Sequence, residues 1–214
     1  MTSLAFSVVD CHPAAQTAAP AIVFRLRIEN AGDGRIHAML LRCQARIEPC
    51  ARQHTEEEAD RLYELFGERS QWDRTLRPVV WTQTAVAVPS FGRSVEVDVP
   101  MPCTYDLEVA AAKYFHGIRG GEIPLLFLFT GTIFQASQGA FSVEPIAWEC
   151  EAPFRMPAGV WHDAMSRFFA GEAWIRIDRD TLDALQAFRG RQAFTSWDAA
   201  LRELLTRRDA AEPV

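Results

Sequence analysis

The sequence predicts an α+β fold in which antiparallel β-strands, arranged as a β-sandwich or an open sheet, precede C-terminal helices. Three observations support this prediction. Polar and apolar residues alternate in several stretches of residues 1–150, as they do in half-buried strands. After Pro157, large apolar residues recur at helical spacing instead. Strands that come first, followed by helices, are typical of α+β proteins and not of βαβ units.

Length and composition fit one folded domain that binds no double-stranded nucleic acid. The chain has 214 residues, of which 49% are hydrophobic, and a formal net charge of −6. A chain of this length buries roughly 70% of its unfolded surface, so it needs no disulfide or metal to hold a core. We expect a single domain over residues 1–214, mainly β over residues 1–150, with residues 151–214 as a mainly helical extension packed on it. The acidic balance argues against a nucleic-acid partner, because phosphates require a basic face.

The N-terminus and the cysteines favour a cytoplasmic location. No basic segment precedes an apolar one at the N-terminus, so no signal peptide is expected. The longest apolar run, residues 123–129, is far shorter than the roughly 20 residues of a membrane span. Five cysteines without a Cys-x-x-Cys pair do not form a disulfide framework. Free thiols are typical of a reducing compartment.

The first strands are predicted over residues 4–9, 21–29 and 36–47. The second of these alternates most regularly, and in the third we expect the residues from His37 to Ile47 at every second position to share a buried face. Between them, residues 30–34 read Asn-Ala-Gly-Asp-Gly, which is typical of a hairpin turn. We therefore expect these two strands to pair with each other in an antiparallel hairpin.

A helix is predicted after the third strand. Thr55 and Glu58 have the spacing of a capping box, which satisfies the free backbone N–H groups at a helix start. An apolar stripe follows over residues 59–66, and Gly67 is typical of a helix end.

Further strands are predicted over residues 79–88, 94–99, 105–115, 123–134 and 141–148. The third of these has an Ala-Ala-Ala-Lys centre that also fits a helix. The fourth is nearly all apolar, as a strand buried on both faces is, and the last is expected to be its hairpin partner.

Helices are predicted for the C-terminal part. One begins at Pro157, a second spans residues 181–189, and Thr195 caps the last. The first carries more large apolar residues than one packing stripe needs. We interpret part of this set, together with a nearby tryptophan, as a partner-binding surface: Trp161, Met165, Phe168 and Trp174.

No standard catalytic or nucleotide-binding motif is present. The P-loop, the Rossmann glycine pattern, the His-Glu-x-x-His zinc motif and the Gly-x-Ser-x-Gly elbow are all absent from the sequence. We therefore expect no enzymatic activity and no cofactor.

One cysteine–histidine set is the best metal candidate. Cys43, Cys50 and His54 supply the sulfur and imidazole ligands that suit zinc or nickel. Their spacing is wider than in usual structural zinc sites, and Cys43 lies on the apolar face of its strand. We expect no bound metal, and keep a metal- or small-molecule-binding protein that uses these residues as the alternative. Cys103 is a weaker candidate, as a nucleophile.

Three segments together resemble a known family. They are residues 35–49, residues 76–82 and, most specifically, residues 97–114, which begin Val-Asp-Val-Pro-Met-Pro-Cys-Thr-Tyr-Asp. They resemble a bacterial family of unknown function whose genes recur beside those of high-affinity uptake [NiFe]-hydrogenases. The resemblance covers nearly the whole chain and implies a role in the assembly, maturation or operation of a hydrogenase. It implies no catalytic residue.

A second, shorter resemblance concerns the C-terminal half. Residues 131–134 and 141–144, with the helices that follow, resemble the SecB export chaperone. This implies a SecB-like sheet and the binding of unfolded clients. We expect a non-enzymatic accessory or assembly protein for a [NiFe]-hydrogenase that acts by protein–protein binding, with a SecB-like chaperone as a further alternative.

Overall fold

The computed structural model describes residues 3–15, 17–32, 34–104, 106, 109–137, 140–169 and 175–211. The chain divides into two compact units, Met1–Trp174 and Ile175–Val214, where the sequence led us to expect one domain. The boundary lies at residue 174, so the first of the C-terminal helices belongs to the same unit as the strands.

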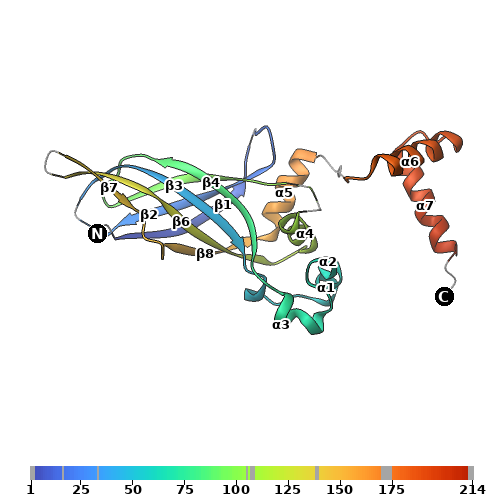
Figure 1. Ribbon diagram of the computed structural model, residues 1–214, viewed down its shortest axis with the longest axis horizontal. Helices are drawn as coiled ribbons and strands as arrows, with labels where there is room; N and C mark the ends of the chain where they lie inside the picture. The colour runs from blue at the N-terminus through green and yellow to red at the C-terminus, as the bar shows by residue number, and fades with distance from the viewer. Residues whose placement is uncertain are drawn as a thin grey trace. The chain divides into compact units, whose positions relative to one another are not determined.

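The strands of the first unit form two antiparallel sheets (Figure 1). The described strands are β1 (Leu4–Pro13), β2 (Ala21–Asn30), β3 (Ile36–Ile47), β4 (Val79–Val88), β5 (Ser94–Pro102), β6 (Glu122–Ser137), β7 (Ala140–Pro145) and β8 (Glu151–Pro157). One sheet has the order β1-β2-β5; the other has the order β4-β3-β6-β7, and β8 also pairs with β6. The α+β class with antiparallel sheets and C-terminal helices is confirmed.

The predicted hairpin between β2 and β3 is wrong. β2 lies between β1 and β5, whereas β3 lies between β4 and β6 in the other sheet. The connection after β2 therefore crosses from one sheet to the other. The Asn30 side chain at the end of β2 donates hydrogen bonds to the Gly34 and Gly92 carbonyls, at 2.7 and 3.2 Å. Alternation identified both strands and their buried faces, but a period of two carries no information about which strand is the neighbour.

A register shift at the start of β3 corrects a second detail. The shift falls between Ile36 and Ala38, so Ile36 is buried and His37 is exposed. From Met39 onward the predicted face is the buried one. The predicted pairing of β6 with a following strand is confirmed, since β7 pairs with it antiparallel.

The first unit also contains helices. They are α1 (Glu56–Arg61), α2 (Tyr63–Phe66), α3 (Trp72–Thr75), α4 (Ala110–Gly117) and α5 (Ala158–Phe169), with short 3-10 turns at Pro49–Ala51 and Arg69–Gln71. The strand predicted over residues 105–115 is wrong over residues 110–115, because the alanine-rich segment forms α4, in agreement with its helix propensity. Strand β8 was not predicted, since Pro153 and Pro157 are unusual in strands away from an edge.

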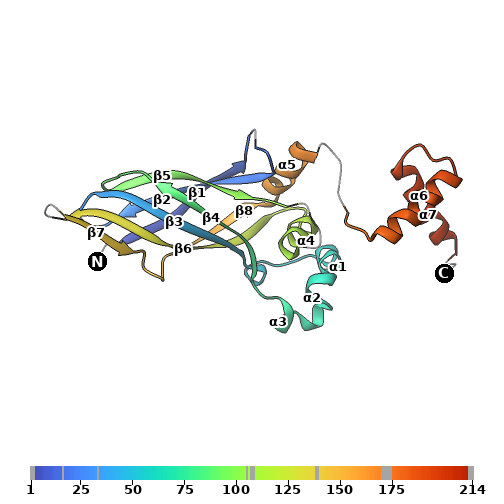
Figure 2. The same ribbon diagram turned by 45° about the horizontal axis from the view of Figure 1, so that its top comes forward.

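The core of this unit lies between the two sheets and under the helices. Phe24 of β2 is 1% exposed, and its ring lies 4.9 Å from Phe127 of β6 and 5.8 Å from Trp81 of β4. At the helical end, Phe115 of α4 stacks on Trp161 of α5 at 5.8 Å. Figure 2 shows that the helices of this unit gather at one end of the strands.

The second unit is a helical hairpin of α6 (Arg179–Arg191) and α7 (Trp197–Ala211). Inside it, Phe188 lies 5.8 Å from Phe194, and the Arg189 guanidinium lies 4.4 Å above the Trp197 ring. The start of α7 is capped by Ser196, whose Oγ accepts from the Ala199 N–H at 3.1 Å, and not by Thr195. No described helix of the protein is long and apolar enough to cross a membrane.

Candidate functional site

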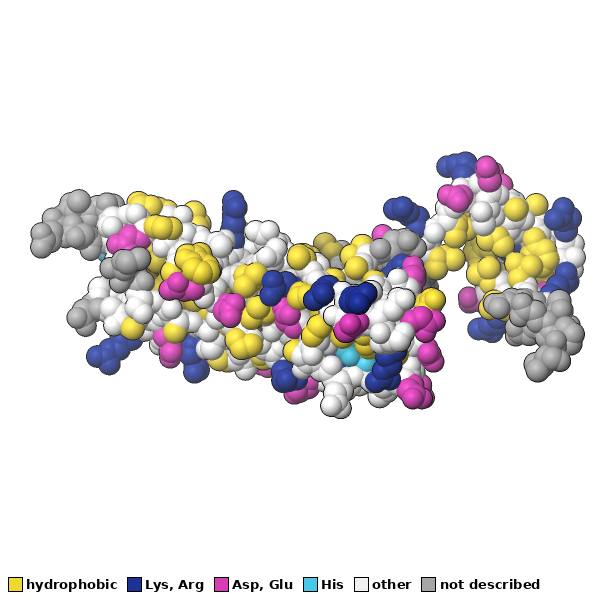
Figure 3. All heavy atoms as spheres, turned by 60° about the horizontal axis from the view of Figure 1, so that its bottom comes forward, with side chains coloured by type: hydrophobic (Ala, Val, Ile, Leu, Met, Phe, Trp, Pro, Cys, Tyr) yellow, Lys and Arg dark blue, Asp and Glu magenta, His cyan; other side chains and the backbone are white. Residues whose placement is uncertain are grey.

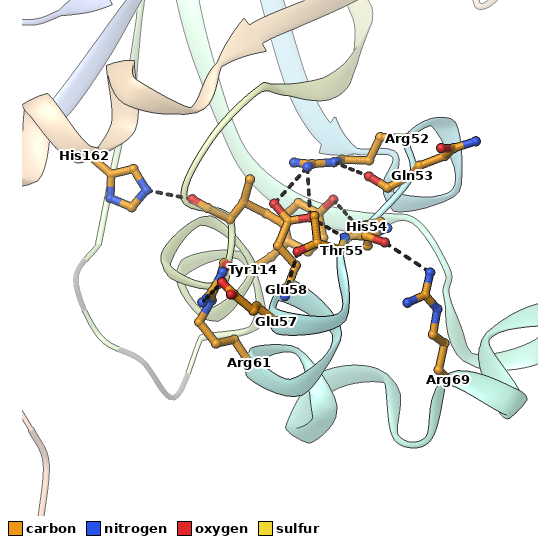
Figure 4. Close-up of polar contacts among 12 residues, drawn as sticks. Arg52, Gln53, His54, Thr55, Glu57, Glu58, Arg61, Arg69, Tyr114 and His162 are labelled. Atoms are coloured by element: carbon orange, nitrogen blue, oxygen red, sulfur yellow. Dashed lines mark hydrogen bonds and ion pairs between the residues drawn. The ribbon is translucent and has the colours of Figure 1, made fainter.

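A polar cluster at the helical end of the first unit joins the segment after β3 to α1 and α4 (Figure 4). Arg52 donates from Nη2 to both carboxylate oxygens of Glu58, at 2.9 and 3.0 Å. The two side chains are 12% and 6% exposed. A buried ion pair of this kind is strongly destabilised when one partner is removed, since the other charge is left uncompensated.

The same carboxylate completes the predicted capping box. Glu58 Oε2 accepts from the Thr55 N–H at 3.1 Å, and Thr55 Oγ1 accepts from the Glu58 N–H at 3.2 Å. The start of α1 is therefore tied to Arg52 through one side chain. Arg52 Nη1 is buried and has no hydrogen-bond partner among the described residues.

His54 and Tyr114 form the second pair of the cluster. Their Nε2 and Oη atoms lie 3.0 Å apart, and both side chains are buried. Burial, reinforced by the Arg52 charge, lowers the pKa of His54 to about 4. Burial raises the pKa of Tyr114 above its ordinary value of 10. At neutral pH the histidine is neutral and only weakly basic, and the tyrosine is protonated, so the pair supplies neither an efficient general base nor an anion.

Further bonds fix the end of α4. Arg61 Nε donates to the Gly117 carbonyl at 2.8 Å, and His162 Nε2 lies 2.7 Å from the Ile118 carbonyl. Arg69 donates to the His54 carbonyl at 3.1 Å. The cluster holds α1, α4 and α5 to the end of the sheet, which is a structural role.

The structure does not bring the three metal candidates together as a site. Cys43 is 1% exposed on the inner face of β3, and burial raises the pKa of its thiol to about 12. Cys50 is exposed and donates from Sγ to the Leu76 carbonyl at 2.7 Å, while His54 is bonded to Tyr114. Among the described residues no group of three or more histidine, cysteine, aspartate or glutamate side chains has the arrangement of a metal site.

Cys103 is not an activated nucleophile. Its side chain is 8% exposed, and burial raises the pKa of the thiol to about 12. A catalytic cysteine needs the opposite, a depressed pKa that supplies the thiolate.

Most of the described residues predicted to bind a partner belong to the core. Trp161 and Met165 are 1% and 3% exposed, because the apolar stripe of α5 faces α4 and the sheet that contains β1 and β2. This corrects the interpretation of these two as surface residues. Phe168 is 41% exposed, and Trp174 lies outside the described residues.

A different surface, the outer face of the larger sheet, exposes apolar side chains side by side. We call it the outer-sheet patch; its members are Ala38 and Leu40 of β3, Ala85 and Ala87 of β4, Thr130, Thr132 and Phe134 of β6, and Val143 and Pro145 of β7. Leu40 is 57% and Val143 60% exposed.

The strand register makes the patch continuous. Leu40 is opposite Ala87 on one side and Thr132 on the other, and Thr132 is opposite Pro145. In the next row, Phe134 lies between Ala38 and Val143.

The centre of the patch is hollowed. Leu40, Ala85, Ala87, Thr130 and Thr132 line an open depression of about 540 Å³ together with Arg42, which lies between Ala85 and Thr130 in the strand register. Sequence reasoning missed this surface, because β3, β4 and the β6–β7 hairpin, which form it, are distant from one another in the chain. The available signal was that, among the outward positions 38, 40 and 42 of β3, 85 and 87 of β4, and 130, 132 and 134 of β6, only Arg42 carries a charge.

Comparison with solved structures finds remote likenesses, three of which follow. IrmA from Escherichia coli is 10% identical, with a TM-score of 0.29, and the match covers 68% of this chain and 87% of that one. A putative late embryogenesis abundant protein is 12% identical, with a TM-score of 0.33 and 72% of each chain covered. For β-glucosidase 3B from Thermotoga neapolitana the identity is 16% and the TM-score 0.25, over 72% of this chain and 17% of that one. These TM-scores carry no argument about fold or function.

The sequence comparisons are more specific. No curated protein matches the chain. Residues 1–213 match a family of unknown function, DUF6084. The match covers nearly the whole chain, so the protein belongs to the DUF6084 family.

Proposed function

We propose that the protein is a non-enzymatic accessory protein that binds another protein through the outer-sheet patch, and that this partner is a subunit or precursor of a [NiFe]-hydrogenase. The observation that carries the binding role is the continuous, exposed and nearly uncharged patch around Leu40. The partner class comes from the family resemblance of residues 35–49, 76–82 and 97–114.

The patch differs from an ordinary solvated sheet face. In antiparallel sheets with one side in water, outward positions are usually polar or charged. The other outward face of the first unit follows that rule: Arg25 pairs with Asp98, and Arg27 with Glu96, at 3.0 and 2.6 Å. Large exposed apolar patches mark interaction surfaces in folded proteins.

The chemistry of the patch defines what it fits. Leucine, valine, proline and alanine side chains offer apolar contact, while Arg42 offers a cation between Ala85 and Thr130. Aromatic residues and arginine, here Phe134 and Arg42, are favoured at protein interfaces over lysine and carboxylates. The patch therefore suits an apolar surface of a protein partner with an acidic or carbonyl group that faces Arg42.

The test is co-purification from a strain that expresses the hydrogenase genes. Leu40→Asp places a charge in the patch, and Val80→Asp is the matched control, since Val80 is also an exposed strand residue, at 56%, but pairs with Arg46 outside the patch. We expect a hydrogenase component with the wild type and the control, and its loss with Leu40→Asp. Absence of any hydrogenase component in the wild-type sample, with normal hydrogenase activity in a deletion strain, would remove the hypothesis.

The same variants distinguish a SecB-like chaperone. A chaperone for unfolded clients would suppress aggregation of an unrelated, chemically unfolded protein, and Leu40→Asp would abolish that effect. Specific capture of the hydrogenase component without such suppression supports the accessory role.

A further inference from the structure

We infer that the C-terminal helical hairpin, residues 175–211, pairs with the same hairpin of a second copy of the chain and so makes the protein a dimer. This inference uses other residues than the proposed function and stands independently of it.

The hairpin buries too little apolar surface to be complete by itself. Among residues 175–207, the part of the hairpin whose side chains the structure describes, only Ala200 is buried. Isolated helices shorter than about 12–15 residues are marginal in water, and units below about 40 residues usually need a disulfide, a metal or oligomerisation. The two helices have 13 and 15 residues, and neither contains a cysteine.

The uncovered apolar side chains form a stripe along α7. Leu205 is 60% exposed, and Leu201, Leu204 and Trp197 are only half-buried. Ile175, which precedes α6, is 68% exposed. Figure 3 shows hydrophobic side chains gathered on the drawn face of this unit, with charged side chains around them.

Charge favours a second copy as the occupant. Residues 175–214 contain seven basic and seven acidic side chains, whereas residues 1–174 contain fifteen and twenty-one. Two copies of the hairpin therefore meet without net repulsion, unlike two copies of the remainder.

The order of the charges points to antiparallel pairing. In α6, Asp180 and Asp183 follow Arg179 in the first half, and Arg189 and Arg191 lie in the last turn. In α7, Asp198 lies at the start, and Arg207, which also pairs with Glu203 at 2.8 Å, lies toward the end. When a helix pairs antiparallel with its symmetry copy across a two-fold axis, its acidic N-terminal end lies beside the basic C-terminal end of the copy. The dipoles of the two helices are then antiparallel, which is also favourable. Two hairpins joined in this way form a four-helix bundle.

The size of the surface predicts a dimer that dissociates on dilution. Helices of this length are about 20 Å long, and two helices side by side are about 20 Å wide, so the footprint is about 400 Å² per copy. Interfaces with a total below about 1,200 Å² belong to weak complexes.

The test is sedimentation equilibrium of the full chain over a range of concentrations. The monomer mass is 24.0 kDa, and we expect the wild type to approach twice this mass as concentration rises. Leu205→Arg introduces a charge into the stripe, which should raise the dissociation constant by roughly tenfold or more. Thr206→Arg is the matched control, an exposed neighbour on the same helix with the same added charge, and should leave the dimer unchanged.

Two further measurements keep the outcome decisive. If circular dichroism shows that Leu205→Arg has lost helix, the dissociation constant of Leu205→Ala is measured instead. Alanine favours the helix and removes only the apolar contact, so this variant should also weaken the dimer. Leu40→Asp should remain dimeric, which separates the hairpin from the outer-sheet patch. A wild type that stays at 24.0 kDa throughout, equal dimerisation of Leu205→Arg and Thr206→Arg, or loss of the dimer in Leu40→Asp would overturn the inference.

Discussion

At the residue scale, Gly131 of β6 occupies a position that only glycine fits. Its φ is +150°, and a Cβ there would overlap the backbone carbonyl of Leu40 on β3. We expect Gly131→Ala to lower the free energy of unfolding by roughly 2–5 kcal/mol, from backbone strain and overpacking together. Urea denaturation measures this change. The control is Gly159→Ala in α5, where a Cβ meets nothing within 4 Å and the helix should gain up to about 1 kcal/mol.

The lowered pKa of His54 predicts how the free energy of unfolding depends on pH. Its pKa is about 4 in the folded protein, compared with 6.5 for an ordinary histidine. As the pH falls below about 6.5, the His54 imidazole is protonated in the unfolded chain before it is protonated in the folded protein. The contribution of His54 is therefore complete above pH 6.5 and decreases as the pH falls toward 4, by up to about 3 kcal/mol.

The measurement is the difference in unfolding free energy between the wild type and His54→Gln, taken at pH 7 and near pH 4. We expect this difference to shrink as the pH falls, because the variant has no imidazole to protonate. His12→Gln removes a half-exposed histidine as the control. A difference that is constant with pH would show that His54 is not held neutral by its surroundings.

At the scale of elements, β2 is the strand whose buried face the sequence predicted most clearly. Its apolar face is buried throughout, and Phe24 contacts rings from β4, β6 and β8. Phe24→Ala should cost about 3–5 kcal/mol, from lost burial and a cavity. Arg25→Ala, one residue along on the exposed face, should change thermal unfolding little, since its ion pair with Asp98 is solvent-exposed. Equal effects of the two substitutions would contradict this packing.

The polar cluster shows how far sequence reasoning extended toward a site. The spacing of Thr55 and Glu58 predicted the capping box, which is local and depends on residues three apart. The pairing of Glu58 with Arg52, and of His54 with Tyr114, was not predicted. Tyr114 is sixty positions from His54, and only the packing of α4 brings them together.

At the scale of the whole molecule, the chain is expected to bind no stoichiometric zinc or nickel. Cys43 lies on the buried face of β3 with a protonated thiol, and His54 Nε2 is hydrogen-bonded to Tyr114. Elemental analysis of the purified protein measures this directly. One metal per chain, lost in Cys43→Ser but retained in a Cys11→Ser control, would establish the metal-binding alternative instead.

The sequence by itself determined the class of fold, most strands with their buried faces, and the helices of the C-terminal part. These properties depend on side chains that are close along the chain, so a period of 2 or 3.6 is sufficient to read them. The tertiary structure alone decided that β2 and β3 lie in different sheets, that Trp161 is core, and that a patch forms around Leu40. Each of these depends on contacts between segments far apart in the chain, and local patterns do not encode which segments meet.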